Sequence, residues 1–245
     1  MLQFKNIAKK LISSILTLIF LVLFIVSAFN IVKWHIANRQ NNEIKEELSE
    51  IVVFDEKDNK YNINFDEIKK INEDTVGWLK INGTEIEYIV VRGKDNNYYL
   101  NHNFKKEYNQ AGWIFADFKN TFDGSDKNIV IYGHNMRDGS MFGTLKKVLN
   151  KDWYNNDKNY IIDLVTESEE QEYQVFSIYQ IEKEDFYITT DFKDDEFSNF
   201  INKIKQRSIK DFNVEITKED SILTVSTCAN DNRYRVVLHA KKVTR

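Results

Sequence analysis

The longest uncharged segment of the chain runs from Leu11 to Val32 and consists mainly of leucine, isoleucine, valine and phenylalanine. As a helix, its 22 residues would extend about 33 Å, which is enough to cross the hydrocarbon core of a bilayer. A cleaved signal peptide has a shorter apolar region, roughly 7–15 residues, that ends at a small-residue site. Only Ser27-Ala28 resembles such a site. The length therefore favours an uncleaved transmembrane anchor over 11–32.

The charges that flank this segment predict its orientation. Lys5, Lys9 and Lys10 precede it, and short positively charged flanks remain in the cytoplasm. Basic residues that follow the segment weaken this bias without reversing it. We therefore expect a single-pass protein of the cell membrane, with a cytoplasmic N-terminus at 1–10 and the rest of the chain outside the cell.

The part that follows the anchor is acidic overall and mixed in charge. It carries 31 of the 34 basic residues and all 38 acidic ones, which argues against a nucleic-acid partner. Residues 33–63 begin with a polar stretch that lacks a clear apolar face, as in a solvated stalk or linker. Residues 64–245 are long enough for one domain with a real core, and we expect them to form an extracellular catalytic domain.

Alternating or continuous apolar runs in this domain predict about eight strands and few helices. Asn82-Gly83 is a strong hairpin signal between two of these runs. The strand-like runs include Leu79–Ile81, Ile86–Val91, Asn128–Tyr132, Tyr160–Val165, Tyr173–Ile181, Ser221–Ser226 and Tyr234–Val243. This pattern favours a mainly β fold, a closed or nearly closed barrel with added helices.

Three helices are predicted from apolar spacing. A short amphipathic helix should begin near Asn64 or Asp66, and another should begin at Ser140 and include Leu145 and Val148. The third carries apolar residues at positions i, i+3, i+4 and i+7, namely Phe197, Phe200, Ile201 and Ile204. One face of that helix should pack on the sheet.

The single cysteine, Cys228, lies where an apolar strand-like run ends, so its thiol should project from the rim of a sheet. A thiol attacks as the thiolate, which a nearby guanidinium or imidazolium stabilises. A lone cysteine is also frequently a buried core residue, and on the cysteine alone the core interpretation is preferred. Its neighbours in the sequence must therefore decide between a nucleophile and a core thiol.

Histidine and arginine residues offer partners for this thiol. His134 follows an apolar strand and a glycine, and strand ends hold functional side chains rigidly at loop openings. His102 and His239 remain alternatives, whereas His35 lies beside the anchor. Arginines 233 and 235 are two residues apart on one strand and share a face, so spacing alone does not choose between them.

Other kinds of chemistry have little support in the sequence. One cysteine and scattered histidines give no zinc-binding spacing, and no phosphate-binding glycine loop is present. The acidic runs lack the spaced oxygen pattern of a calcium loop and are typical of a solvated face. We expect neither a metal nor a cofactor.

Several short motifs in the right order resemble class B sortases, the membrane-anchored cysteine transpeptidases of Gram-positive bacteria. The family's Thr-Leu-x-Thr-Cys signature is similar to Thr224-Val225-Ser226-Thr227-Cys228. The other motifs are Gly77-Trp78-Leu79-Lys80-Ile81, Tyr98-Tyr99-Leu100-Asn101-His102, Tyr132-Gly133-His134-Asn135-Met136 and Asp138-Gly139-Ser140-Met141-Phe142. The resemblance covers roughly residues 75 to 245. It implies an eight-stranded sortase-like barrel with an N-terminal helical extension and a helix before the seventh strand.

The resemblance also implies roles for individual residues. Cys228 would be the nucleophile, His134 would move the proton, and Arg235 would hold the oxyanion, because in this family the arginine precedes a Val-Val-x-x-Ala run such as 236–240. The residues implied to bind the substrate are Asn96, Leu100, Tyr187, Ile188 and Ser226.

The implied reaction cleaves a C-terminal sorting motif of surface proteins, similar to Asn-Pro-x-Thr-Asn/Gly. The acyl group would then pass from a thioacyl enzyme to an amine of cell-wall peptidoglycan. The expected partners are surface proteins with a sorting signal, the peptidoglycan precursor amine and the membrane. Two alternatives stay open: a thiol peptidase with water as acceptor, and a non-catalytic surface-binding domain in which Cys228 belongs to the core.

Overall fold

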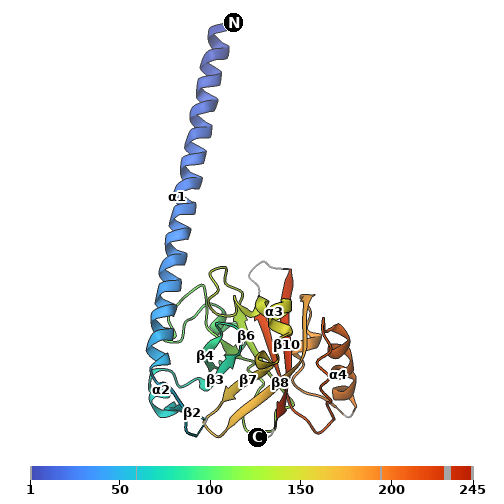
Figure 1. The fold of residues 1–245 in the computed structure, drawn as a ribbon. Coiled ribbons are helices and arrows are strands. Elements are labelled where there is room, and N and C mark those ends of the chain that lie inside the picture. The colour runs from blue at the N-terminus through green and yellow to red at the C-terminus, as the bar shows by residue number, and fades with distance from the viewer. Residues whose placement is uncertain (1, 59, 194, 229–232, 244–245) are drawn as a thin grey trace. The chain divides into compact units, whose positions relative to one another are not determined.

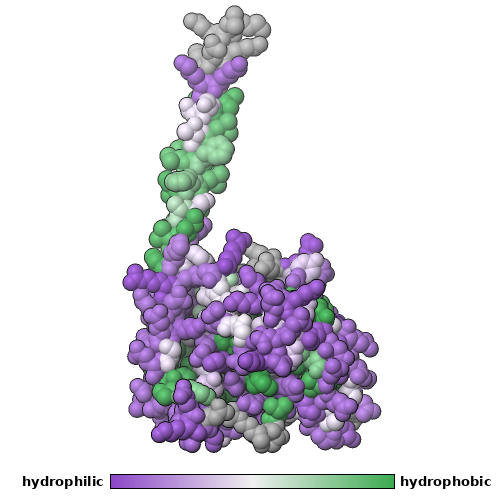
Figure 2. Space-filling view, in the orientation of Figure 1, coloured by the Kyte–Doolittle hydropathy of each residue, from purple (hydrophilic) through white to green (hydrophobic). Residues whose placement is uncertain are grey.

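The computed structural model describes residues 2–58, 60–193, 195–228 and 233–243, and the side chains of residues 2–8 and of Cys228 lie outside this description. The chain divides into two compact units, Met1–Gln40 and Asn41–Arg245. Helix α1 (Leu2–Ser49) forms the first unit and continues into the second (Figure 1). From Lys9 onward α1 is long and apolar enough to cross a membrane. Its predicted anchor segment is exposed along its length and forms an apolar surface (Figure 2).

The second unit is a closed eight-stranded β-barrel, as predicted, with the strand order β10-β8-β7-β3-β4-β5-β6-β9. Its strands are β3 (Thr75–Ile81), β4 (Glu87–Val91), β5 (Phe115–Ala116), β6 (Asn128–His134), β7 (Ile161–Val165), β8 (Glu170–Glu182), β9 (Ile222–Cys228) and β10 (Tyr234–Val243). The pairs β4–β5 and β6–β9 are parallel, and the other neighbouring pairs are antiparallel. The barrel is therefore a mixed one.

All seven residues of strand β6 are buried. A strand with both faces covered reads as a continuous apolar run, which is what the sequence contains from Ile129 to Tyr132. The predicted hairpin is confirmed by the pairing of β3 with β4, which places Trp78 opposite Ile89. In its turn, Gly83 has a φ of 72°, a conformation that favours glycine.

Two of the predicted helices are confirmed. Helix α2 (Phe65–Ile71) is capped by Asn64, whose side chain accepts a hydrogen bond from the Glu67 amide. Helix α4 (Glu196–Arg207) buries the four apolar residues that the spacing picked out and lies beside β8 (Figure 1). Short helical pieces fill the connections, namely η1 (Tyr98–Leu100), η2 (Leu145–Leu149), α3 (Lys151–Tyr154), η3 (Asp157–Asn159) and η4 (Phe186–Ile188).

The helix predicted to begin at Ser140 is wrong. Met141 has a φ of 50°, which breaks a helix, and it pairs with Asn135 in an isolated β-bridge. Helical structure starts only with η2, as a 3-10 turn. A tight turn therefore precedes the helical residues.

The segment predicted as a stalk contains more structure than its polarity indicates. A two-stranded sheet forms between β1 (Val52–Asp55) and β2 (Lys60–Ile63). Near the end of α1, Ile44 and Leu48 belong to the barrel's apolar core, with exposed fractions of 5% and 3%. The compact unit of the barrel thus begins at Asn41. The division into cytoplasmic end, anchor, stalk and extracellular domain stays a prediction.

Candidate functional site

The parallel pairing of β6 and β9 brings the predicted histidine and cysteine to one edge of the barrel. In this register Asn128 lies opposite Ile222, and His134 lies opposite Cys228. Both residues are the last of their strands. The register concerns the backbone, and the thiol of Cys228 lies outside the described part of the structure. Two segments almost a hundred residues apart in the chain thus end side by side.

Arg235 comes to the same edge from the other side of β9. The antiparallel register of β10 with β9 pairs Val237 with Ser226, and continuing it by two residues brings Arg235 level with Cys228. The side chain of Arg235 is 8% exposed. Arg233 lies outside β10 and is exposed, and its carbonyl accepts a hydrogen bond from the Lys183 amide at 3.1 Å. The structure therefore separates two arginines that sequence spacing could not.

The Nε2 nitrogen of His134 is held by a hydrogen bond to the main chain. The ring is 4% exposed, and Nε2 donates to the carbonyl oxygen of Leu100 at 2.7 Å. A carbonyl only accepts, so Nε2 carries a proton and Nδ1 is the nitrogen that can exchange one. Burial lowers the pKa of His134, and the hydrogen bond to Leu100, which favours the charged ring, offsets part of this shift.

Gly133 lets the end of β6 fit beneath its neighbours. A Cβ at this position would lie 2.5 Å from Ile114 Cδ1 and 2.7 Å from Phe142 Cγ. Only glycine fits such an approach without displacing these side chains. After β6 the chain turns back on itself, and the Phe142 amide donates a hydrogen bond to the His134 carbonyl at 2.9 Å. The glycine next to the histidine in the sequence is therefore a packing requirement of this strand end.

A cavity of about 410 Å³ opens at this edge. It is lined by His134 and Arg235 and by all five residues that the sequence predicts for substrate binding. The remaining lining residues are Asn97, Phe115, Tyr132, Lys183, Glu184, Asp185 and Thr227. The structure thus brings together residues from η1, β6, β9, β10 and the segment after β8.

Three of the predicted substrate-binding residues already have partners in the protein. Ser226 Oγ donates to the Tyr187 hydroxyl at 3.2 Å. Asn96 Nδ2 donates to Asp117 Oδ2 at 2.8 Å, and its Oδ1 accepts from the Phe118 amide at 3.0 Å. These bonds fix the walls of the cavity.

Asp117 was not among the residues predicted from the sequence. It is 4% exposed and also accepts from the Tyr132 hydroxyl at 2.8 Å, so one carboxylate holds two lining residues of the cavity. The available signal was an acidic residue directly after the short apolar segment Ile114–Ala116, but such a signal is common at strand ends. Its role depends on long-range contacts that spacing does not reveal.

The alternative histidines have other surroundings. His239 is fully buried, and it bonds the Tyr179 hydroxyl through Nε2 and Thr224 Oγ1 through Nδ1, both at 2.8 Å. His102 stacks on Tyr98 with ring centroids 4.0 Å apart, and His35 belongs to the first compact unit. Of the four histidines, all of them described, His134 is the one that lines the cavity.

No group of three histidine, cysteine, aspartate or glutamate side chains within the described residues is arranged to hold a metal ion.

Comparison with known proteins identifies the class to which this barrel belongs. Residues 79–243 match the family model of the sortase domain, and the chain therefore belongs to the sortase family of cysteine transpeptidases. Its relatives define the kind of sortase. The chain is 36% identical to Sortase B of Listeria monocytogenes over 97% of its own length and 99% of the relative's. It is 32% identical to Sortase B of Staphylococcus aureus over 93% and 95%.

Solved structures agree with this assignment. Sortase B from B. anthracis in complex with AAEK1 superposes with a TM-score of 0.77 at 34% identity, covering 86% of this chain and 100% of that one. A Staphylococcus aureus sortase B–substrate complex gives a TM-score of 0.69 at 36% identity, over 74% of this chain and 84% of the other. The predicted eight-stranded sortase-like barrel is thereby confirmed, and the chain is a sortase-type cysteine transpeptidase of the B class.

Proposed function

We propose that this transpeptidase cleaves a C-terminal sorting motif similar to Asn-Pro-x-Thr-Asn/Gly and joins the surface protein to an amine of cell-wall peptidoglycan. The observation that carries the proposal is the strand register at the cavity, in which His134 is opposite Cys228 and Arg235 is level with it. The three predicted catalytic residues therefore come from three adjacent strands. Such strands position side chains more precisely than loops do.

The first half of the reaction forms a thioacyl enzyme. The Cys228 thiolate attacks the carbonyl carbon of the motif's threonine, and the carbonyl oxygen becomes an oxyanion next to the Arg235 guanidinium. When the tetrahedral intermediate collapses, the C–N bond to the following residue breaks. The His134 imidazolium gives its Nδ1 proton to the leaving amine, while the Nε2 proton stays with the Leu100 carbonyl.

The second half reverses these proton movements. The acceptor amine attacks the thioester, His134 Nδ1 takes the proton that the amine loses, and the C–S bond breaks to restore the thiolate. Because His134 is buried, its pKa is lowered and the neutral ring that accepts this proton is favoured. Bulk water in the same position would give hydrolysis instead, so the outcome depends on which nucleophile enters the cavity.

The walls of the cavity carry both apolar and polar groups that could contact a peptide. Leu100 and Ile188 offer apolar contacts, while Asn96, Tyr187 and Ser226 offer polar groups that their neighbours hold in place. We assign these five residues to binding of the sorting motif. We also propose that α1 anchors the enzyme, with residues 1–10 in the cytoplasm, 11–32 in the membrane, 33–63 as a linker and 64–245 on the outer face.

The test is an assay of the full-length chain in detergent micelles with a peptide that carries the motif. With triglycine as an amine acceptor, mass spectrometry should detect a new peptide in which triglycine replaces the residues that follow the threonine. Without the acceptor, slow release of the free acid is expected. Cleavage that yields only the free acid at every acceptor concentration would support the thiol peptidase, and failure to cleave the motif would contradict the proposed substrate.

A further inference from the structure

The last turns of α1 are tied to the loop that leads toward the cavity. Asn41 on α1 and Asn109 in the loop are buried, with exposed fractions of 1% and 2%. Asn109 Nδ2 donates to Asn41 Oδ1 at 3.0 Å, and Asn41 Nδ2 donates to the carbonyl oxygen of Gly112 at 3.0 Å. Because buried amides must find partners, these two bonds fix the loop's main chain against the helix.

Gly112 in turn lies directly on the main chain that holds the histidine. A Cβ on Gly112 would stand 2.4 Å from the Tyr99 carbonyl oxygen and 2.8 Å from that of Leu100. The Trp113 amide donates to the Tyr99 carbonyl at 3.0 Å, so no side chain separates the two segments. The same Leu100 carbonyl accepts the hydrogen bond from His134 Nε2.

We propose that Asn41 is a positioning residue for His134: it fixes Gly112, which fixes the Leu100 carbonyl and thereby the ring. Asn41 does not touch the substrate in this proposal. The effect on turnover rests on the proposed role of His134 as the proton carrier, whereas the effect on the ring itself does not. The loop over 101–114 contains no helix or strand of its own. A rigid element beside it, here α1, is therefore needed to hold its main chain in place.

The pKa of His134 should report on how firmly the Leu100 carbonyl is held, because that carbonyl accepts the hydrogen bond from the ring. The Leu100 hydrogen bond opposes the lowering of the pKa of His134 by burial, so a looser Leu100 carbonyl should let that pKa fall further. The titratable or charged groups beside the ring are Cys228, opposite His134 in the strand register, Lys183, Glu184 and Asp185 after β8, and Arg235 on β10. They are the same in each of the variants below, which change no charge near the ring.

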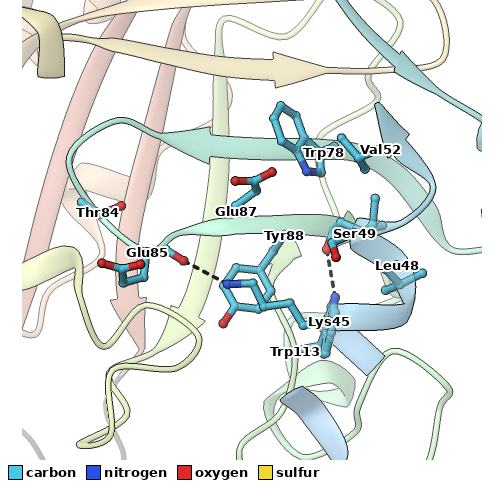
Figure 3. Close-up of a pocket in the computed structure, with 11 residues that line it drawn as sticks. Lys45, Leu48, Ser49, Val52, Trp78, Thr84, Glu85, Glu87, Tyr88 and Trp113 are labelled. Atoms are coloured by element: carbon cyan, nitrogen blue, oxygen red, sulfur yellow. Dashed lines mark hydrogen bonds between the residues drawn. The ribbon is translucent and has the colours of Figure 1, made fainter. Parts of the chain in front are cut away.

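The experiment replaces Asn41 in the full-length chain by leucine, which has nearly the same size but neither donates nor accepts a hydrogen bond. Lys45→Met is the matched control on the same helix. Lys45 Nζ donates to the carbonyl oxygen of Glu85 at 3.1 Å and lies over the Tyr88 ring, at a pocket that Trp113 of the loop also lines but that Gly112 and Leu100 do not (Figure 3). That carbonyl belongs to the β3–β4 turn rather than to the segments around Leu100.

We expect Asn41→Leu to lower kcat by about tenfold and to change KM by less than about twofold, because the ring is displaced while the substrate walls stay. In an NMR titration, the pKa of His134 should be lower in Asn41→Leu than in the wild type. Lys45→Met should keep the wild-type kcat, KM and His134 titration.

Other outcomes separate the two levels of the proposal. A lowered His134 pKa with unchanged kcat would support the positioning and contradict the catalytic role of His134. Wild-type titration in Asn41→Leu, or an equal change in Lys45→Met, would overturn the positioning. Asn41→Ala is the second variant, and if neither Asn41 variant folds while Lys45→Met does, Asn41 serves stability alone and the proposal is overturned.

Discussion

Arg235 and Arg233 are chemically identical, and their surroundings predict different contributions to the reaction. Arg235 is buried at the cavity, whereas Arg233 is exposed outside β10. Removing one oxyanion donor typically lowers kcat by about 10²–10³. We therefore expect Arg235→Ala to lose activity by that factor and Arg233→Ala to stay within about tenfold of the wild type. Single-turnover assays with a sorting peptide measure both.

Arg235→Lys should restore little of the lost activity, because an ammonium lacks the planar fork of the guanidinium. The reverse ranking, with Arg233→Ala inactive and Arg235→Ala nearly normal, would mean that the register of β10 does not bring Arg235 to the cysteine.

His239 predicts a dependence of stability on pH. Its burial lowers the pKa from an ordinary 6.5 to about 3, so in acid the unfolded chain takes up a proton that the folded chain does not. The stability contributed by the neutral ring is complete above pH 6.5 and is lost as the pH falls from 6.5 toward 3. The corresponding slope is at most about 1.4 kcal/mol for each pH unit.

Guanidinium unfolding of the wild type and of His239→Phe between pH 7 and about pH 4 measures this slope. The variant should be less stable at pH 7, because the hydroxyls of Tyr179 and Thr224 lose a buried partner at about 1–3 kcal/mol each. Its decline with acid should also be shallower. Parallel curves for the two proteins would show that His239 does not titrate on unfolding.

At the scale of single residues, the sequence predicts side chains that act through their own chemistry. Cys228 and His134 stand at the ends of apolar runs, which makes them candidates, and the resemblance to class B sortases selects them over a core thiol and over the other histidines. The hydrogen bond from His134 to Leu100 could not be predicted, since it uses a main-chain carbonyl that any residue would supply. The role of Asp117 in the cavity wall could not be predicted either, because its hydrogen-bond partners are distant in the chain.

The loop between η1 and β5 is the element whose shape most directly affects the cavity. Gly112→Ala would add a Cβ that collides with the Tyr99 and Leu100 carbonyls, so η1 must shift and the acceptor for His134 with it. Gly124→Ala is the control, because both glycines have positive φ, 59° and 89°, but a Cβ at Gly124 meets no atom within 4 Å. Both variants therefore carry the backbone strain, and only one carries the collision.

We expect Gly124→Ala to keep kcat within about twofold and Gly112→Ala to lower it by about tenfold or more. Thermal unfolding measures the backbone strain, which should lower the Tm of both variants. A loss of kcat in Gly112→Ala alone would then come from the displaced carbonyl and not from the strain. Equal kcat values in the two variants would contradict a role of the Leu100 carbonyl in holding the histidine.

At the scale of elements, strands were easier to predict than their connections. The strands of the barrel alternate or run continuously apolar because each has at least one face in the core, and α4 was found from its apolar spacing. The turn at Met141 resembles the start of a helix in composition, and only its positive φ reveals a turn. The β1–β2 sheet and the packing of α1 beyond Asn41 on the core could not be predicted from the sequence. The few apolar residues that form these contacts lie among polar ones.

At the scale of the whole molecule, the chain combines a helix apolar enough to cross a membrane with a barrel that carries the reaction. The strands that carry the proposed catalytic residues, β6, β9 and β10, come from the middle and the end of the chain and lie side by side in the closed barrel. Cys228→Ala should leave this closure intact, since loss of one sulfur costs at most about 1–2 kcal/mol of cavity energy. Unfolding of that variant would instead favour a core thiol.

The most direct test of a thioacyl enzyme at Cys228 is the intact mass of the full-length chain, quenched in acid during turnover of a sorting peptide without an amine acceptor. We predict an added mass equal to the peptide up to its threonine, located on Cys228 by peptide mapping, absent from Cys228→Ala and removed when triglycine is added. Efficient cleavage of the peptide by Cys228→Ala, or an adduct on another residue, would contradict it.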